Sequence, residues 1–449
     1  MNRINVDFGR QIGTIRPLHG VNSGPRTYSF YHNTTQYFQE AGIPYSRLHD
    51  TEYPYGSGHF VDIPCIFKNF DADENDPASY DFEMTDMYIQ AIYEAGTKVF
   101  YRLGVSIEHA PVKRNVYPPK DPVKWARICE HIIRHYNEGW ANGFHYGIEY
   151  WEIWNEPEGN GTWRVSMWMG SDEEYFNLYS ITANHLKKCF PNIKVGGYAS
   201  CGFYAAFAEA PTENHKKILA FADDFFRYIT APETRAPLDF FSWHIYSSDL
   251  YMYENFARYA RSLMAKYGFS GAESILDEWN YGGEDMFNRM RNEYGAALAA
   301  GALCVMQHNE VTLANYYDSQ PSMCYCGIFS LETREPTKTF YSLKAWNELY
   351  KLGSEVETSS DCPDVRLCAA VNGGKGGILV SSYKAEDSDL WISVRGLSGE
   401  KGVKASIWMT DKDHFFEKVS EEVFFGDQIS FLRKKDAYTT LYIELEVLR

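Results

Sequence analysis

The chain has 449 residues, of which 45% are hydrophobic, and a formal net charge of −17 at pH 7. This length predicts two modules, because a single hydrophobic core rarely serves more than about 250–300 residues. The negative charge repels phosphate backbones and anionic membrane surfaces, so neither nucleic acid nor a membrane is expected as a partner. The first residues, MNRINVDF, carry charges where a signal peptide is apolar, and the nine cysteines have no regular spacing. Together these features predict a cytoplasmic protein with reduced thiols.

Short apolar runs alternate with helical stretches from residue 15 to residue 352, the pattern of a parallel sheet covered by helices. One such helix is expected to begin after Asp121 as N-cap, with Pro122 in its first turn, and to run to about Glu138. The predicted strands end near Asn22, Leu48, Leu103, Asn155, Ala199, Tyr246, Glu278 and Tyr317. Both the count and the length fit an α/β fold of the (β/α)8, or TIM, barrel type.

The pattern changes after a helix expected over residues 340–352. Residues 353–364 read as a polar linker, and strand-like segments separated by turns follow at residues 365–371, 377–383, 389–397, 403–410, 422–431 and 438–447. This spacing predicts a small antiparallel β-sandwich. We therefore expect a catalytic barrel over residues 15–352 and a C-terminal sandwich over residues 353–449, which the strand-like segment 1–14 joins.

Two glutamates stand at the ends of predicted strands. Glu156 lies in the segment WEIWNEPE (residues 151–158), where a proline stops an apolar strand, because proline cannot donate a ladder hydrogen bond. Glu278 closes a similar segment, ESILDEWN (residues 273–280). On our strand count these are strands four and seven, and closure of a barrel brings their ends to the same C-terminal mouth, where barrel enzymes place their catalytic groups.

A pair of carboxyl groups at one barrel mouth is the catalytic pair that a retaining glycosidase requires. One group protonates the leaving oxygen, and the other, about 5–5.5 Å away, attacks the anomeric carbon. Glu156 and Glu278 can form this pair without a metal or other cofactor. Asn155 is placed to hydrogen-bond the sugar hydroxyl next to the anomeric carbon, and Tyr246 is a candidate to donate to Glu278.

The tetrapeptide Trp-Asn-Glu-Pro at residues 154–157 resembles the acid/base strand of the clan A barrel glycosidases, which carry the acid/base on strand four and the nucleophile on strand seven. Within this clan the chain is most similar to glycoside hydrolase family 39, which contains β-xylosidases and α-L-iduronidases. The segments RLH (residues 47–49) and DFFSWHIY (residues 239–246) resemble the family's second and sixth strands. The C-terminal sandwich also resembles the family plan.

The resemblance implies that Glu156 is the general acid/base and Glu278 the nucleophile. Arg47 is implied as a brace near the nucleophile. The residues expected at the substrate are Asn155, His49, His244, Tyr246, Arg47, Trp154 and Trp279. Two features depart from the family's xylosidases: Asp277 and Trp279 flank the nucleophile where these enzymes usually carry a Thr-Glu-Phe sequence, and the eighth strand lacks the acidic loop that often holds a terminal xylose.

We therefore expect a retaining exo-glycosidase that acts by double displacement on short oligosaccharides or glycosides, with β-xylosidase-like activity first. An arabinosidase, galactosidase or uronidase of the same family is the alternative. A non-catalytic carbohydrate-binding barrel is the third, although it predicts the loss of one carboxylate and both are present. The long segments 49–76 and 163–171 favour a pocket for chain ends, and the family resemblance implies a homo-oligomer.

Two other classes of site are weighed against this reading. His131 and His135 stand four residues apart, as two metal ligands on one helix would, but Ile132 occupies the position where the zincin pattern requires glutamate. Trp125 and Ile128 give the same helix an apolar face, so the histidines are expected to flank a buried stripe. A serine esterase is disfavoured because the chain contains no Gly-x-Ser-x-Gly elbow.

Overall fold

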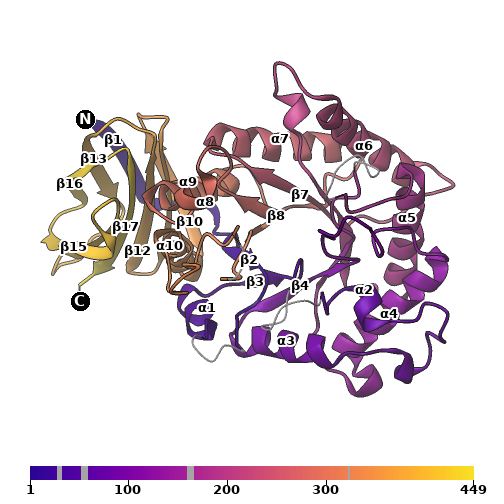
Figure 1. Ribbon diagram of the computed structural model, residues 1–449. Helices are drawn as coiled ribbons and strands as arrows, with labels where there is room; N and C mark the ends of the chain where they lie inside the picture. The colour runs from indigo at the N-terminus through magenta and orange to yellow at the C-terminus, as the bar shows by residue number, and fades with distance from the viewer. Residues whose placement is uncertain (28–32, 52–58, 159–165, 322–323, 449) are drawn as a thin grey trace.

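The computed structural model describes residues 1–27, 33–51, 59–158, 166–321 and 324–448. An eight-stranded parallel barrel and a mostly antiparallel sheet lie side by side (Figure 1). The barrel strands are β2 (Gly20–Asn22), β3 (Tyr45–Arg47), β4 (Lys98–Leu103), β5 (Tyr150–Ile153), β6 (Lys194–Ser200), β7 (Phe240–Tyr246), β8 (Glu273–Asn280) and β9 (Leu313–Tyr316). They follow one another in chain order, and β9 pairs with β2, so the barrel closes. The predicted barrel fold is confirmed.

Helices surround the barrel. They are α1 (Thr35–Ala41), α2 (Ile63–Ile66), α3 (Glu83–Glu94), α4 (Pro122–Glu138), α5 (Asp172–Cys189), α6 (Glu213–Thr230), α7 (Leu250–Lys266), α8 (Met286–Arg289), α9 (Glu293–His308) and α10 (Lys338–Leu352), with short 3-10 turns at Pro77–Ser79, Trp140–Asn142 and Tyr204–Ala206. Helix α4 begins as predicted, because the Asp121 side chain accepts hydrogen bonds from the N–H groups of Val123 and Lys124. No helix in the described part of the chain has the length and apolar character to span a membrane.

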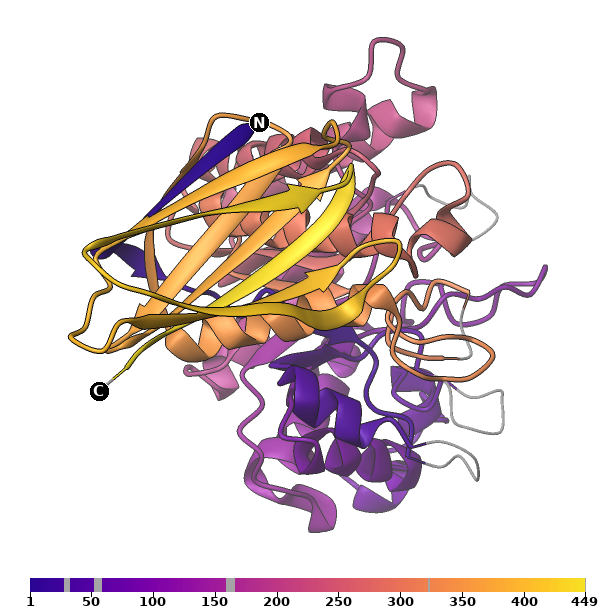
Figure 2. The same ribbon diagram turned by 90° about the vertical axis from the view of Figure 1, so that its left-hand side faces the viewer.

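The second region is a nine-stranded sheet in the order β15-β14-β17-β12-β11-β10-β1-β13-β16. Its strands are β1 (Asn2–Thr14), β10 (Ser354–Ser360), β11 (Val365–Asn372), β12 (Lys375–Tyr383), β13 (Ser388–Arg395), β14 (Val403–Thr410), β15 (Phe415–Phe424), β16 (Gln428–Lys435) and β17 (Tyr438–Val447). Strand β1, at the other end of the chain, pairs with β10 and β13, and Figure 2 shows it beside the C-terminal strands. Ile407 of β14 and Phe431 of β16 belong to one buried cluster, so the sheet curves around a core of its own.

Two expectations about this sheet are wrong. The segment predicted as a polar linker contains β10, which pairs with β1. Only Glu355 and Val356 of this strand are buried, so its sequence lacks the alternation of apolar and polar residues that predicts a strand. The run over residues 422–431 was expected to be one strand, but β15 ends at Phe424 and β16 begins at Gln428. Gly426, whose φ is 102°, lies in the turn between them, a conformation that glycine adopts more readily than other residues.

Helix α9 lies between the barrel and the sheet. Its residues 295–307 are all buried, because it contacts α7 and α10 of the barrel as well as strands β11, β12 and β17. A helix that is covered on all sides is expected to be apolar all round, as this one is. The helix therefore joins the two regions through one continuous core.

The barrel interior is layered along the strands. Near the strand beginnings it is filled by a cluster of apolar and aromatic side chains: Tyr45, Phe100, Tyr150, Phe240, Ile275 and Leu313. Side chains two residues further along a strand point to the same side. In β3, β5 and β8 these next interior residues are Arg47, Glu152 and Asp277, and all three are buried. A charged layer therefore lies between the apolar layer and the C-terminal mouth.

Candidate active site

Arg47 occupies the centre of the charged layer and is fully buried. Its Nε and Nη2 atoms lie 2.9 and 2.7 Å from Glu152 Oε2, and Nε lies 3.0 Å from Asp277 Oδ2. Nη2 also donates to Asn155 Oδ1 at 2.6 Å, and Nη1 donates to Asn22 Oδ1 at 3.1 Å. Burial alone would lower the pKa of Arg47, but the neighbouring carboxylates outweigh it and raise the pKa. Arg47 is thus a permanent cation that ties four strand ends together.

His244, on β7, joins the two glutamates that the sequence predicts to be catalytic. Its Nδ1 atom lies 2.7 Å from Glu156 Oε1 and 2.8 Å from Glu278 Oε2. Its Nε2 atom lies 3.5 Å from Asp277 Oδ2. Burial disfavours a charged imidazole, but the charges of Glu278 and Asp277 outweigh burial and raise the pKa of His244 well above its ordinary value. His244 is therefore a cation that holds the two carboxylates close together.

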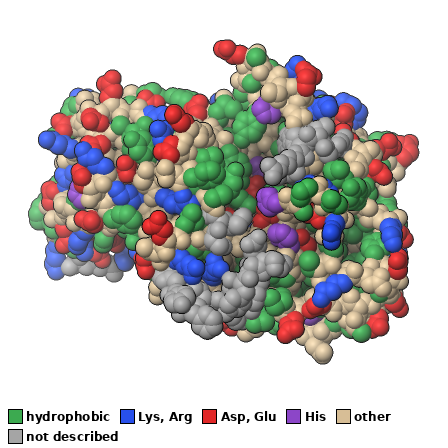
Figure 3. Space-filling model, in the orientation of Figure 1, with side chains coloured by type: hydrophobic (Ala, Val, Ile, Leu, Met, Phe, Trp, Pro, Cys, Tyr) green, Lys and Arg blue, Asp and Glu red, His purple; other side chains and the backbone are tan. Residues whose placement is uncertain are grey.

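The spacing of these carboxylates distinguishes two kinds of chemistry. The ligand atoms of Glu156, His244 and Glu278 all lie within 4.8 Å of one another. Retaining glycosidases place their two carboxyl groups about 5–5.5 Å apart, whereas inverting enzymes need about 6.5–9.5 Å to admit a water molecule. The Glu156 side chain is 22% exposed and that of Glu278 is 6% exposed, so Glu156 lies nearer to solvent. Figure 3 shows histidine and acidic side chains gathered near the middle of the barrel face.

A β-bulge in β8 places the nucleophile candidate. Trp243 pairs with Leu276 and His244 pairs with Glu278, so β8 has one residue, Asp277, more than β7 over this stretch. A bulge allows two consecutive side chains to face the same side of a sheet, and bulges are common beside active sites. Both Asp277 and Glu278 consequently reach into the barrel interior.

A backbone turn places the acid/base candidate. Strand β5 ends at Ile153, and the next residues include Trp154 with φ of 73° and Glu156 with φ of 45°. Non-glycine residues seldom adopt this left-handed conformation, and such strain is concentrated at functional sites. The N–H of Glu156 donates to the carbonyl of Ala199 in β6 at 3.1 Å, which fixes the turn over the barrel mouth.

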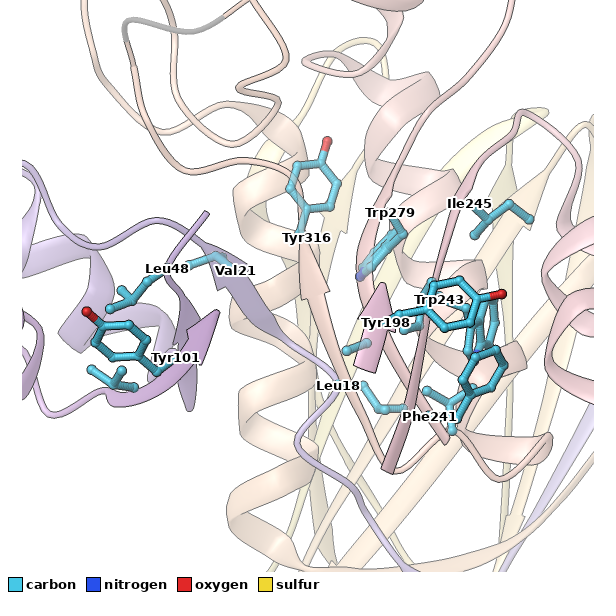
Figure 4. Packing of buried hydrophobic residues seen from close by; sticks show 14 of the residues in the cluster. Leu18, Val21, Leu48, Tyr101, Tyr198, Phe241, Trp243, Ile245, Trp279 and Tyr316 are labelled. Atoms are coloured by element: carbon cyan, nitrogen blue, oxygen red, sulfur yellow. The ribbon is translucent and has the colours of Figure 1, made fainter. Parts of the chain in front are cut away.

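The two tryptophans expected at the substrate do not lie there. Trp154 is 2% exposed, and its Nε1 donates to the carbonyl of Met167 at 2.8 Å. Trp279 is fully buried against Tyr253 of α7 and against Tyr316, which stands beside it in Figure 4. In both cases the chain turns the neighbour of a catalytic candidate toward the surrounding helices, so these rings belong to the core.

Asn155 and His49, also expected at the substrate, are buried close to the charged layer. Within the described residues, Asn155 Nδ2 and both ring nitrogens of His49 lack a hydrogen-bond partner. His49 Nε2 lies 3.5 Å from Asp50 Oδ2. Burial and the cation of Arg47 lower the pKa of His49 well below its ordinary value, so the ring is neutral. Buried polar atoms normally have partners. Hydroxyl groups of a bound sugar would supply them.

Tyr246 was expected to donate a hydrogen bond to Glu278, but it makes none in the part of the chain that the structure describes. His244 and Arg47 approach Glu278 instead, Arg47 with Nη1 at 3.9 Å from Oε1. Tyr246 packs with Tyr317 and Tyr325, whose ring centroids lie 6.4 and 5.8 Å away. Burial, followed by the charge of Glu278, raises the pKa of the Tyr246 phenol, so its hydroxyl stays protonated and can donate to a ligand.

Sequence reasoning missed three carboxyl groups of the site. Glu152 faces the interior, and burial together with the charge of Asp277 raises its pKa to about 8 despite Arg47. Burial and the charge of Glu156 likewise raise the pKa of Glu158 to about 8. Asp50 accepts hydrogen bonds from the N–H of Ile107 and from the Tyr317 hydroxyl, and burial raises its pKa. Glu158 stands two residues after Glu156 and Asp50 directly follows His49, which was the available signal.

The histidine pair on α4 makes hydrogen bonds within the protein. His135 Nδ1 lies 2.9 Å from the carbonyl of Trp140, and its Nε2 lies 2.9 Å from Asp86 Oδ1. His131 Nδ1 lies 2.8 Å from the carbonyl of Arg127 within the same helix. Both nitrogens of His135 are therefore already engaged, in agreement with the expected structural role of this pair.

Comparison with known proteins identifies the family. Residues 4–275 match the family described as Glycosyl hydrolases family 39. This chain belongs to glycoside hydrolase family 39. The matched part is more than half of the chain and contains Glu156, while Glu278 lies three residues beyond its end, as 278 minus 275 gives. The expectation drawn from the sequence segments is confirmed.

Two curated relatives of this family 39 chain are bacterial β-xylosidases. The enzyme from Geobacillus stearothermophilus is 28% identical over 225 residues, covering 47% of this chain and 39% of the relative. The enzyme from Caldicellulosiruptor saccharolyticus is 25% identical over 264 residues, covering 55% and 47%. The chain thus spans less than half the length of either relative.

Solved structures share the fold. A glucosidase from Croceicoccus marinus superposes with a TM-score of 0.80 at 21% identity, over the full length of both chains. A monomeric β-xylosidase from Caulobacter crescentus CB15 superposes with a TM-score of 0.71 at 16% identity, also over both full chains. These likenesses establish the barrel with its accompanying sheet and leave the substrate open.

Proposed function

We propose that this family 39 protein is a retaining exo-glycosidase that hydrolyses β-xylosides by double displacement. The observation that carries the proposal is the close approach of Glu156 and Glu278 around His244, with one carboxylate oxygen of each glutamate within 4.8 Å of the other. In this mechanism Glu278 attacks the anomeric carbon while Glu156 protonates the departing oxygen. Water then hydrolyses the glycosyl ester of Glu278 with Glu156 acting as the base.

The surrounding groups support these roles. Glu278 is approached by the two cations Arg47 and His244, which lie 3.9 and 2.8 Å from its carboxylate oxygens. Asn155 is held through Oδ1 by Arg47, so its Nδ2 remains available to donate to the hydroxyl beside the anomeric carbon. Such a contact strengthens as the oxocarbenium-like transition state forms.

The charges of the site favour a neutral sugar. Burial, to which the charge of Glu278 adds, raises the pKa of both Asp50 and Asp318. Arg47 and His244 are already paired with carboxylates. A uronate would therefore find no spare cation among these groups. The two β-xylosidase relatives favour xylose, and the glucosidase among the similar structures makes glucose the first alternative.

Exo action is a separate part of the proposal. It draws on the length of the segments 49–76 and 163–171 in the sequence. Residues 52–58 and 159–165 lie outside the described part of the chain. Hydrolysis of a reduced xylo-oligosaccharide tests exo action directly: an exo enzyme releases single xylose units from the non-reducing end, whereas early release of longer products would contradict it.

A panel of nitrophenyl glycosides tests the activity and the sugar. We expect the β-xyloside to give the highest kcat/KM among β-xyloside, α-arabinoside, β-glucoside, β-galactoside and β-glucuronide. Glu278→Ala and Glu156→Gln should lower kcat by at least about 10³-fold. Glu332→Gln, at an exposed glutamate, is the control and should leave kcat unchanged. A higher kcat/KM for the β-glucoside would make a β-glucoside the substrate in place of a β-xyloside. A folded protein that binds xylo-oligosaccharides but hydrolyses none of the five glycosides would favour the non-catalytic alternative.

A further inference from the structure

A second group of potential ligands lies where α9 ends against the sheet. His308 is the last residue of α9, Glu355 lies in β10 and Cys368 in β11. His308 Nε2 lies 3.5 Å from Glu355 Oε1, and Cys368 Sγ lies 4.0 Å from the same oxygen. All three ligand atoms lie within 4.8 Å of one another. We propose that His308, Glu355 and Cys368 bind a zinc-type divalent metal ion that links the barrel to the sheet.

The spacing fits tetrahedral coordination. Zinc binds histidine nitrogen at about 2.0–2.1 Å, carboxylate oxygen at about 2.0–2.2 Å and thiolate sulfur at about 2.3 Å, which places the ligand atoms roughly 3.3–3.6 Å apart. The nitrogen and sulfur distances to Glu355 Oε1 are within a few tenths of an ångström of this range. The His308 side chain is 43% exposed, so solvent can reach the ion and supply a fourth ligand.

The buried carboxylate of Glu355 gives an independent reason for a ligand here. Glu355 is 7% exposed, and its Oε2 accepts a hydrogen bond from Gln307 Nε2 at 2.6 Å. Among the residues that the structure describes, its Oε1 has only the long contacts with Cys368 and His308. A buried carboxylate that lacks strong partners is costly, and burial accordingly raises the pKa of Glu355. A metal ion at Oε1 would complete its coordination.

Burial raises the pKa of the Cys368 thiol well above its ordinary value, so a metal ion has to displace a proton from this ligand. Burial and the cations of Arg16 and Arg366 lower the pKa of His308, so the imidazole is neutral, the form that ligates metals. Arg16 and Arg366 repel an added metal ion. Glu355 and the thiolate of Cys368 offset this repulsion with two negative charges. On binding, the Cys368 thiol loses its proton to solvent and its sulfur coordinates the ion.

A second His-Cys-Glu group in the chain serves as a matched control. Glu130, His185 and Cys189 lie at the contact between α4 and α5. In that group both carboxylate oxygens are already occupied: Arg134 lies 2.8 Å from Glu130 Oε1, and His185 Nε2 lies 2.6 Å from Oε2. A metal would have to displace these strong contacts, so the proposal does not extend to this group.

The position of the proposed site predicts an effect on stability and none on catalysis. His308 ends α9 and precedes β9, so it lies at the end of the barrel where strands begin, opposite the C-terminal mouth. An ion that binds only the folded chain raises its stability. Zinc should therefore raise Tm while the rate of glycoside hydrolysis stays unchanged.

Titration of the full chain with Co²⁺, and with Zn²⁺ in competition with a chromophoric chelator, tests the proposal. We expect one equivalent of Co²⁺ to give a thiolate-to-cobalt charge-transfer band. His308→Ala and Cys368→Ser should each abolish the band and weaken Zn²⁺ binding at least tenfold, whereas His185→Ala and Cys189→Ser should retain both. Absence of the band in the unmodified chain, its persistence in His308→Ala, or its loss in Cys189→Ser would overturn the proposal. His308 is half-exposed, so its variant carries the test even if Cys368→Ser folds poorly.

Discussion

Asp277 and Glu278 are consecutive residues of β8, yet both carboxylates face the barrel interior. Asp277 Oδ2 lies 3.0 Å from Arg47 Nε, and Glu278 Oε2 lies 2.8 Å from His244 Nδ1. The bulge at Asp277 makes this possible, because an extra residue interrupts the alternation of the strand. Asp277 thus lies next to both cations, Arg47 and His244, that approach the proposed nucleophile.

Asp277→Asn should impair catalysis through those cations. Asp277 is one of the charges that raise the pKa of His244, so its removal lowers that pKa. We expect kcat to fall about tenfold to hundredfold, as loss of a charged hydrogen-bond partner would give, and the alkaline limb of the pH–rate profile to move to lower pH. The control is Asp224→Asn, whose side chain on α6 is 49% exposed. An unchanged profile in Asp277→Asn would show that Asp277 does not control His244.

Arg47→Met should be severely destabilising. The substitution leaves Glu152 and Asp277 buried without their cation, and removal of one partner from a buried ion pair typically costs about 3–5 kcal/mol. Arg10→Met breaks an exposed pair with Glu357, in which Arg10 is 65% exposed, and should cost at most about 1 kcal/mol. Denaturant unfolding measures both. Equal stability of the two variants would contradict the central role of Arg47.

Glu158 should make stability depend on pH. Its pKa is raised from 4.5 to about 8 in the folded chain, so the folded state holds a proton that the unfolded state releases. This contribution is full below the unfolded pKa of 4.5 and is lost as the pH rises through about 8. We expect the free energy of unfolding of Glu158→Gln to decline less steeply between about pH 5 and pH 8, by a few kcal/mol at most. Glu332→Gln should retain the original slope, and a retained slope in Glu158→Gln would refute the assignment.

Trp154→Phe should affect stability and spare substrate binding. The substitution removes the indole donor to Met167 in a buried cluster, which we expect to cost about 1–3 kcal/mol of unfolding free energy. Trp168→Phe, which removes a similar buried donor to Ser171, is the matched control. Both variants should keep KM within about twofold, since neither removes a substrate contact. A tenfold rise of KM in Trp154→Phe alone would return this ring to the substrate site.

The sequence was sufficient where local pattern determines structure. The strand runs and the proline after Glu156 placed the two glutamates at one mouth, and the N-cap at Asp121 placed α4. The sequence was insufficient where contacts between distant segments determine the structure. The bulge that brings Glu278 inward beside Asp277 depends on pairing with two neighbouring strands, and β10 forms because the N-terminal strand pairs with it. The left-handed backbone that sends the Trp154 ring into the core also leaves no mark in residue types alone.

The central claim is that Glu278 forms the covalent bond to the sugar. It is tested most directly by incubating the protein with a 2-deoxy-2-fluoro-β-xyloside that carries an activated leaving group, followed by peptide mass spectrometry. Fluorine slows both chemical steps, and the activated leaving group restores the first, so the glycosyl ester accumulates. We predict a mass increase of one fluorinated sugar on Glu278. A label on Asp277 or Glu152, or hydrolysis with inverted configuration and no label, would contradict the assignment.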